Sequence, residues 1–151
     1  MLLLRHASAG KRLSKPSLDA ARGLDRTGRR QAVRLQQELA GYTVERVVSS
    51  PLARCVATVT PLADALGLEV EVRDELEPSA MKRDVLRVLR EFPSAALVCT
   101  HREVFETLFD GEIECEKGGV WIVERHSRSL TPVAYLPAPA TRRRRAALAS
   151  R

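Results

Sequence analysis

The stretch Leu2-Leu3-Leu4-Arg5-His6 decides the fold. Its three leucines form an apolar run that is typical of a strand buried on both faces of a parallel sheet. A cation and an imidazole follow directly, so both are expected at the carboxyl end of this strand. In open α/β sheets the ligand site lies outside the carboxyl ends of the strands. The stretch therefore predicts an α/β fold with a functional site at His6.

A second apolar run, residues 95–100, leads directly into His101. Two buried strands that each end in a histidine predict a site with paired histidines. Around them, strand-like and helix-like periodicities alternate. This alternation predicts a three-layer α/β sandwich, with a mostly parallel central sheet and helices on both faces. The further strands are expected over residues 44–49, 68–72, 119–123 and 130–136.

Local signals place the helices between these strands. Asp25 is the expected N-cap of the first helix, which Gly41 ends. A second helix is expected from Pro51 to the cap at Gly67. Residues 8–23, which contain glycine, lysine and proline, are predicted to form a loop. The remaining helices are expected over residues 82–92 and in a short segment through residues 105–109.

Length and charge predict one domain with a basic tail. The chain has 151 residues and a net charge of +6, and Arg142–Arg145 is a run of four arginines. We expect a domain over residues 1–137 and a flexible Ala/Pro/Arg-rich tail over residues 138–151. No aromatic residues alternate with the arginines, so nucleic-acid binding is disfavoured, although the basic tail leaves it open.

Cysteine spacing and hydropathy exclude several classes of protein. Cys55, Cys99 and Cys115 are odd in number and widely spaced, which predicts neither a disulfide framework nor a zinc site. We therefore expect no metal and no cofactor. No apolar run approaches the roughly 20 residues that span a bilayer. Charge follows the first leucines at once, unlike a signal peptide, so no membrane partner and a cytoplasmic location are expected.

Arginines complete a candidate phosphate site. Arg54 lies one turn into the helix that follows the second strand, near Arg5, His6 and His101 if the strands are parallel. Guanidinium groups bind phosphate oxygens through a planar fork, and helix N-termini add amide donors. A histidine in such a site can attack phosphorus and form a phosphohistidine that water then hydrolyses.

These residues resemble the motifs of a known family. In order along the chain, four stretches are similar to signatures of the histidine phosphatase (phosphoglycerate mutase-like) superfamily. Because short connections join its predicted elements, the chain is most similar to the small SixA-type phosphohistidine phosphatases of this superfamily. The stretches are residues 4–7 (L-R-H-G, with Ala7 for glycine), 24–32 (L-T-x-x-G-x-x-Q-A), 49–58 (S-S-P-L-x-R-A-x-Q-T) and 100–101, at the second histidine.

The resemblance implies roles for individual residues. His6 would be the nucleophile, with Arg5, Arg54 and His101 holding the phosphate. The family usually places a general acid after the third strand, where Glu75 is favoured and Glu77 is the alternative. A basic first loop adds a possible substrate rim of Ser8, Lys11 and Arg12.

The predicted function is a metal-independent phosphatase that acts through a covalent phosphohistidine, on protein phosphohistidine. Its partner would be a phosphorylated protein or a small phosphorylated substrate. One alternative is a nucleotide or polyphosphate phosphatase, because Glu116–Trp121 resembles a segment in the phosphatase half of two-domain Nudix hydrolases. The others are a catalytically weak module that binds phosphorylated partners, and a nucleic-acid tether that uses the arginine tail.

Overall fold

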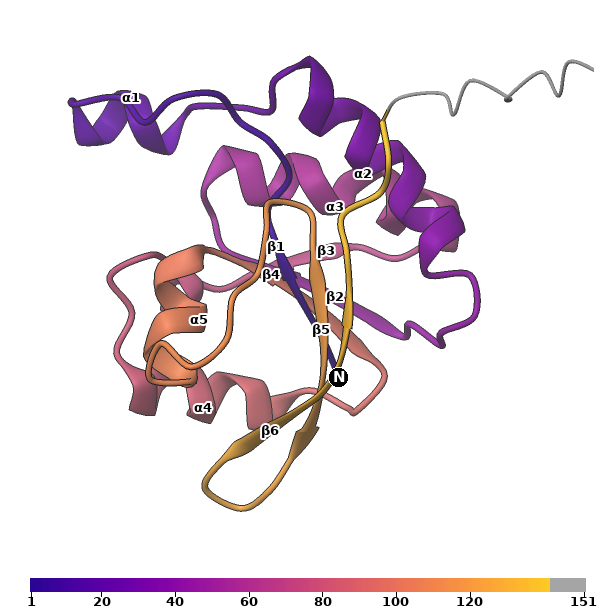
Figure 1. Cartoon of the computed structure of the whole chain (residues 1–151), viewed down its shortest axis with the longest axis vertical. Coiled ribbons are helices and arrows are strands. Elements are labelled where there is room, and N and C mark those ends of the chain that lie inside the picture. Colours follow the sequence, from indigo (N-terminus) through magenta and orange to yellow (C-terminus); the bar gives the residue numbers. More distant parts are fainter. Residues whose placement is uncertain (142–151) are drawn as a thin grey trace, which may run out of the picture.

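A six-stranded sheet forms the centre of the protein (Figure 1). The computed structural model describes residues 1–141. The strand order is β3-β2-β4-β1-β5-β6; the first four of these strands are parallel, and β5 and β6 form an antiparallel hairpin at one edge. The strands are β1 (Leu2–Arg5), β2 (Arg46–Ser49), β3 (Val70–Val72), β4 (Ala96–Thr100), β5 (Val120–Arg125) and β6 (Leu130–Leu136).

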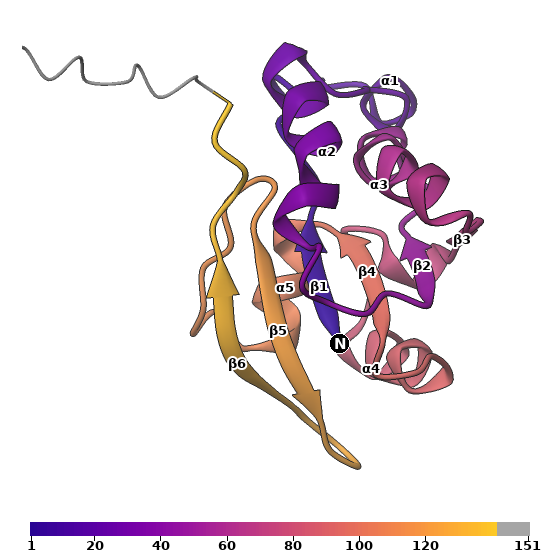
Figure 2. The same ribbon diagram turned by 90° about the vertical axis from the view of Figure 1, so that its right-hand side faces the viewer.

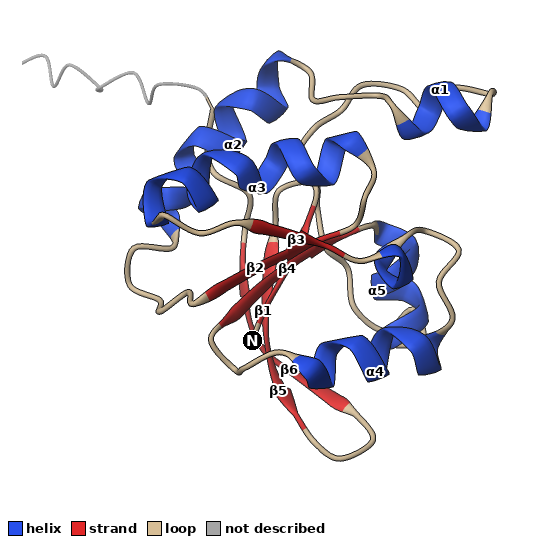
Figure 3. Ribbon diagram, turned by 180° about the vertical axis from the view of Figure 1, so that it is seen from behind, coloured by secondary structure: helices blue, strands red, loops and turns tan. Residues whose placement is uncertain are grey.

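Helices cover both faces of the parallel part of the sheet. Figures 2 and 3 show α2 and α3 on one face, and α4 and α5 on the other. The short helix α1 lies apart from these layers, within the connection from β1 to α2. The helices are α1 (Pro16–Ala20), α2 (Arg26–Glu38), α3 (Ala53–Leu66), α4 (Lys82–Glu91) and α5 (Arg102–Leu108), with a 3-10 turn, η1 (Asp74–Leu76), after β3.

Side-chain alternation along the strands divides the core into two clusters. Leu2 and Leu4 pack with α2 and α3, whereas Leu3 packs with α4 and α5. Because successive side chains of a strand point to opposite faces, one leucine run supplies both clusters. The apolar residues 96–99 of β4 alternate between the same two clusters. Burial on both faces explains why β1 and β4 show continuous apolar runs rather than alternating polarity.

The predicted α/β sandwich is confirmed, with a sheet that is mixed rather than wholly parallel. Asp25 caps α2 as expected, because its carboxylate accepts a hydrogen bond from the Gly28 N–H at 2.8 Å. One expectation is wrong in detail: α1 interrupts the predicted loop at residues 8–23. Pro16 at its first turn has a backbone angle already suited to a helix. The arginine run 142–145 lies outside the described residues.

Strand order places a ligand site at the carboxyl ends of β1 and β4. From β1 the chain passes to β2 and β3 on one side, returns to β4, and then crosses to β5 on the other side of β1. Connections therefore leave β1 and β4 in different directions, which opens a crevice beyond their ends. None of the helices in residues 1–141 is long and apolar enough to cross a membrane.

Candidate active site

The two histidines meet at the carboxyl ends of β1 and β4. The His6 N–H donates to the Thr100 carbonyl at 3.0 Å, which ties the two strand ends together. The His6 and His101 rings lie 5.4 Å apart between centroids, at an interplanar angle of 60°. The structure thus brings together the two residues that the sequence predicted would share a site.

His6 is held with one ring nitrogen free. Its Nδ1 lies 2.8 Å from the Ala7 carbonyl oxygen, which can only accept, so Nδ1 carries the proton and Nε2 has the lone pair. Burial lowers the pKa of His6 to about 4, and Arg54 and Arg5 act in the same direction. The ring is therefore neutral near pH 7. Because Ala7 keeps a negative φ, alanine serves in place of the glycine of the motif.

Thr58 on helix α3 fixes the backbone that orients His6. The Thr58 hydroxyl accepts from the Ala7 N–H at 2.9 Å and donates to the Arg54 carbonyl at 2.6 Å. One side chain thus links the residue that orients His6 to the backbone of Arg54. Thr58 is fully buried, so the link lies inside the protein. The two hydrogen bonds of Thr58 therefore fix the backbone beside His6 relative to that of Arg54.

Arg54 and Arg5 reach the site from different elements. Arg54 is 2% exposed, and its guanidinium donates to the Asp19 carbonyl at 3.0 Å. Arg5 donates to the Cys115 carbonyl at 2.8 Å. In both arginines the Nε–H is buried and has no hydrogen-bond partner among residues 1–141. Buried donors in native proteins are nearly always paired, so two such groups in residues that line one cavity indicate a ligand site for an anion.

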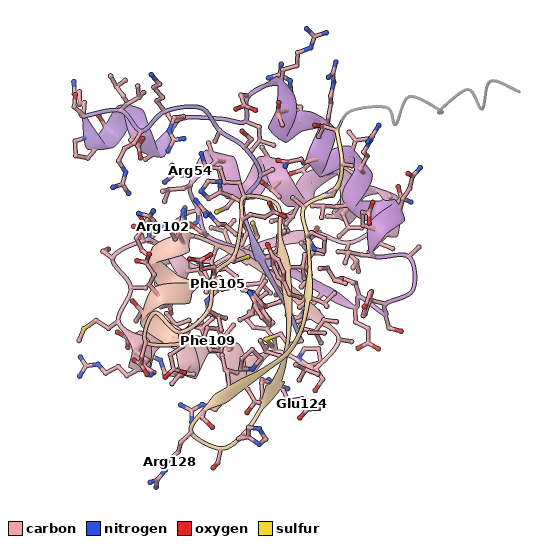
Figure 4. The ribbon with its side chains drawn as sticks, viewed as in Figure 1. Arg54, Arg102, Phe105, Phe109, Glu124 and Arg128 are labelled. Atoms are coloured by element: carbon pink, nitrogen blue, oxygen red, sulfur yellow. The ribbon has the colours of Figure 1, made fainter. Side chains whose placement is uncertain are left out.

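These residues border a cavity with a strongly positive lining. Its volume is about 290 Å³, and six of its lining side chains are cationic while one is a carboxylate. Figure 4 shows Arg54 and Arg102 on the same side of the molecule, far from Arg128 at the tip of the hairpin. The balance of charge suits a doubly charged phosphoryl group. The lining residues are Arg5, His6, Gly10, Arg12, Arg22, Arg54, Arg102, Glu103 and Lys117.

His101 lies behind His6 and is completely buried. Its Nε2 is 2.8 Å from the Ser50 hydroxyl, and the Cys55 sulfur is 3.5 Å from the same nitrogen. Burial, together with the neighbouring His6 and Arg54, lowers the pKa of His101 to about 2. His101 is therefore a neutral ring, and Ser50 holds it in place.

The predicted acids lie outside the cavity. Glu75 sits on η1 and forms an ion pair with Arg73 at 3.2 Å, and Arg73 also binds Glu91. Glu77 follows η1 and is also absent from the cavity lining. The carboxylate that does line the cavity is Glu103, on the first turn of α5. It forms an ion pair with Arg12 at 2.9 Å across the mouth of the cavity.

The three predicted rim residues are placed differently from one another. Arg12 lines the cavity, whereas Lys11 is exposed and lies outside the lining. The Ser8 hydroxyl donates to the Asp25 carboxylate at 2.6 Å, and that carboxylate also accepts from the Gly10 N–H. Ser8 therefore holds the loop in shape rather than facing a substrate.

Sequence reasoning missed five residues at the site. Arg22, Arg102, Glu103 and Lys117 line the cavity, and Asp19 contacts both Arg22 and Arg54. Arg102 and Glu103 directly follow His101, so their position after this strand end could have indicated that they belong to the site. Arg22 and Asp19 carry no local signal, because only the folded loop brings them to α3.

Comparison with known proteins identifies the class. The sequence profile described as the histidine phosphatase superfamily (branch 1) matches residues 1–83. The chain therefore belongs to the histidine phosphatase superfamily, as its motifs predicted. Within that superfamily its fold is that of the SixA type. The protein histidine phosphatase SixA, solved with tungstate, aligns with a TM-score of 0.74 and 23% identity over 90% of this chain and 95% of its own.

Other relatives carry different names. A SixA described as a phosphohistidine phosphatase from Agrobacterium tumefaciens aligns with a TM-score of 0.70 and 20% identity, over 91% of this chain and 96% of its own. An 8-oxo-(d)GTP phosphatase of Mycolicibacterium smegmatis is 27% identical over 92% of this chain and 48% of its own length. The chain thus spans about half of that relative. These comparisons fix the family and fold and leave the substrate open.

Proposed function

We propose that the protein is a phosphatase that acts through a covalent phosphohistidine on His6. The observation that carries this proposal is a neutral histidine, with Nε2 free, at a cavity with six cationic side chains. A neutral imidazole is the nucleophilic form, so the site needs no base to activate it. The charge of the phosphoryl group would be offset by side chains, and no metal is required in this scheme.

The reaction would take place in two steps. In the first, the Nε2 lone pair of His6 forms a bond to phosphorus while the bond from phosphorus to the leaving group breaks. The Nδ1 proton stays on the ring and is donated to the Ala7 carbonyl, which stabilises the positive ring that forms. In the second, a water oxygen attacks phosphorus and the N–P bond breaks. Inorganic phosphate leaves, and His6 returns to its neutral form.

The arginines would supply electrostatic stabilisation. The unpaired Nε–H groups of Arg5 and Arg54 provide donors for phosphate oxygens, and neither needs to move from its backbone contact. Donors that are already oriented act on the transition state without a reorganisation cost. His101 would support the same centre through its contact with the His6 ring.

We assign proton transfer to Glu103. Its carboxyl group lines the cavity, whereas Glu75 and Glu77 lie outside that lining. In the first step the carboxyl would give its proton to the departing atom, and in the second the carboxylate would take a proton from water. Proton balance over the cycle is then complete. Arg12, its ion-pair partner, would bind the incoming phosphate.

Two substrate classes are candidates. Protein phosphohistidine, the predicted substrate, is supported by the SixA fold and by a cavity mouth at which Arg12 is 65% exposed. Nucleotides are supported by the M. smegmatis relative and by Lys117, which lies in the cavity within the Glu116–Trp121 segment. A cytoplasmic location, expected from the sequence, stays part of the proposal.

The test is turnover of p-nitrophenyl phosphate and of a phosphohistidine-carrying protein, side by side in EDTA. Wild type is expected to cleave at least one, and His6→Ala to cleave neither. His126→Ala, at the far hairpin turn, is the matched control and should keep full activity. Mass spectrometry after an alkaline quench should find one phosphoryl group on His6. Turnover by His6→Ala, or binding without turnover by wild type, would overturn the proposal.

A further inference from the structure

A second and larger cavity adjoins the catalytic one. Its volume is about 640 Å³, and it shares the walls formed by Arg5 and Arg102 with the catalytic cavity. Figure 4 shows Arg102 and Phe105 on the same helix, α5, below Arg54. The proposed reaction uses nothing else from this second cavity. Its lining residues are Arg5, Arg102, Phe105, Glu106, Gly111, Ile113, Glu114, Cys115 and Glu116.

The lining of the second cavity differs in kind from that of the first. Phe105 and Cys115 are buried and Ile113 is half-buried, so they form an apolar floor. Three carboxylates stand around that floor together with the two shared guanidinium groups. An apolar surface with a few polar groups is the usual composition of a site for a small organic ligand, and the volume lies in the usual range.

The three carboxylates differ in whether they have an ion-pair or hydrogen-bond partner. Glu106 forms an ion pair with Arg102 at 3.3 Å, and Glu116 accepts from the Ala138 N–H at 2.8 Å. The Glu114 carboxylate has neither an ion pair nor a hydrogen bond within residues 1–141. Its backbone is nevertheless fixed, because the Glu114 carbonyl accepts from the Trp121 indole N–H at 2.7 Å. The Glu114 carboxylate is thus an exposed acceptor on a fixed backbone at the edge of the cavity.

We infer that the second cavity binds the heterocyclic base of a purine nucleotide whose phosphate occupies the catalytic cavity. This inference rests on the proposed function and names its substrate class. A purine has an apolar face for the floor, and guanine also has an edge with N–H donors for a carboxylate. Because the two cavities share Arg5 and Arg102 in their walls, a single nucleotide would place its phosphate in one and its base in the other.

Discrimination between substrates tests the inference. For GMP and for p-nitrophenyl phosphate, kcat/KM is measured in wild type, Glu114→Gln and Glu112→Gln. The loss of one hydrogen bond to a charged group should lower the GMP to p-nitrophenyl phosphate ratio about tenfold in Glu114→Gln. Glu112, an exposed acid on the same loop outside both cavities, is the matched control and should leave the ratio unchanged.

A binding measurement separates this inference from the proposed reaction. Trp121 is the one tryptophan of the chain and contacts Glu114, so its fluorescence reports on the second cavity. In the His6→Ala protein, GMP should bind with a fluorescence change and about tenfold more tightly than ribose 5-phosphate, which lacks the base. GMP binding without turnover by wild type would overturn the reaction alone.

The opposite results would overturn the inference. One is turnover of p-nitrophenyl phosphate that requires His6, with a GMP ratio unaffected by Glu114→Gln. Another is equal binding of GMP and ribose 5-phosphate. A third is a higher kcat/KM for a phosphohistidine-carrying protein than for GMP, with both values unchanged in Glu114→Gln. Protein phosphohistidine would then be the substrate instead.

Discussion

Two loops border the catalytic cavity, and they are held in different ways. The first loop, residues 7–24, contains α1 and is held largely by its own polar side chains: Arg22 binds Asp19 at 2.9 Å and the Ala9 carbonyl at 2.6 Å. The second loop, residues 109–119, is held through its backbone by side chains from the sheet, such as Tyr135, which accepts from the Glu116 N–H. Side chains of the second loop are therefore freer to vary.

This difference coincides with different roles for the two loops in the function that we propose. The superfamily profile matches residues 1–83, so it contains the first loop and excludes the second. The first loop brings Arg12 and Arg22 to the catalytic cavity, whereas the second brings Glu114 and Glu116 to the neighbouring cavity. In the proposed scheme the first loop would therefore serve the reaction and the second loop the choice of substrate.

Loss of a first-loop anchor should have the largest effect. Arg54→Ala removes a phosphate donor and the contact with Asp19, and should lower kcat by roughly 10²–10³. Arg54→Lys keeps the charge but loses the planar fork, so it should recover only part of the loss. Steady-state kinetics with p-nitrophenyl phosphate measures both variants. Full recovery by lysine would mean that Arg54 acts only as a charge.

Glu103→Gln should have the next largest effect, and one that depends on the leaving group. With a glycerol phosphate, whose alkoxide is a poor leaving group, kcat should fall about 10²-fold. With p-nitrophenyl phosphate the loss should be far smaller, because nitrophenolate leaves without a proton. Glu75→Gln is the control and should behave as wild type. If Glu75→Gln shows the dependence on the leaving group instead, the acid lies after β3 as the sequence predicted.

The pH dependence should reveal the buried state of His6. Its pKa is lowered to about 4 by burial, so the ring stays neutral to lower pH than an ordinary histidine. Accordingly kcat/KM should stay level from neutral pH down to about pH 5 and fall tenfold per pH unit only below about 4. An acid limb near pH 6.5 would show that His6 is not shielded by the first loop.

The same shift affects stability with a definite sign. Because the folded pKa of His6 is lowered, the unfolded chain binds the extra proton first as pH falls below about 6.5. The free energy of unfolding should therefore decline between about pH 6.5 and pH 4, by on the order of 3 kcal/mol from His6. Urea titrations at several pH values measure this free energy of unfolding. They also define the pH range in which the protein is folded and the activity profile can be interpreted.

Two glycine substitutions compare the loops through stability alone. A methyl group on Gly28 would lie 1.9 Å from the Ser8 carbonyl oxygen, so the first loop would have to move away from α2. Gly28→Ala should cost about 3 kcal/mol. Gly111, in the second loop, has a φ of +74° and open space around it, so Gly111→Ala should cost only about 1–2 kcal/mol of backbone strain. Denaturant unfolding measures both; equal costs would contradict the tighter packing of the first loop.

The position of four residues of the candidate site was predictable from the sequence because it depends on local patterns. Arg5 and His6 end an apolar run, and Arg54 follows a strand and a turn, so strand ends alone bring them near one another. Glu75 was predicted from its position after β3, and the structure gives its carboxylate to Arg73. An ion pair between a strand end and η1 leaves no mark in the local pattern. Proximity to a strand end therefore does not establish that a side chain faces the cavity.

The second cavity could not be predicted for a related reason. Its floor combines Phe105 from α5 with Ile113 from the second loop, and its walls include Arg5 from β1. These residues meet because the second loop leads from α5 into β5, which pairs with β1. The expected mostly parallel sheet was correct, but the sequence pattern did not indicate that β5 pairs with β1.

The position of β1 has a consequence for the growing chain. Leu2 pairs with Leu97 on one side and with Ile122 on the other, so every strand that borders β1 follows much later in synthesis. The leucine run that leads to His6 must wait, unpaired and apolar, while most of the polypeptide leaves the ribosome. Such non-local pairing makes folding slow and leaves strand edges open to aggregation. The strand that carries Arg5 and leads to His6 can therefore pair on both sides only after β4 and β5 have been made.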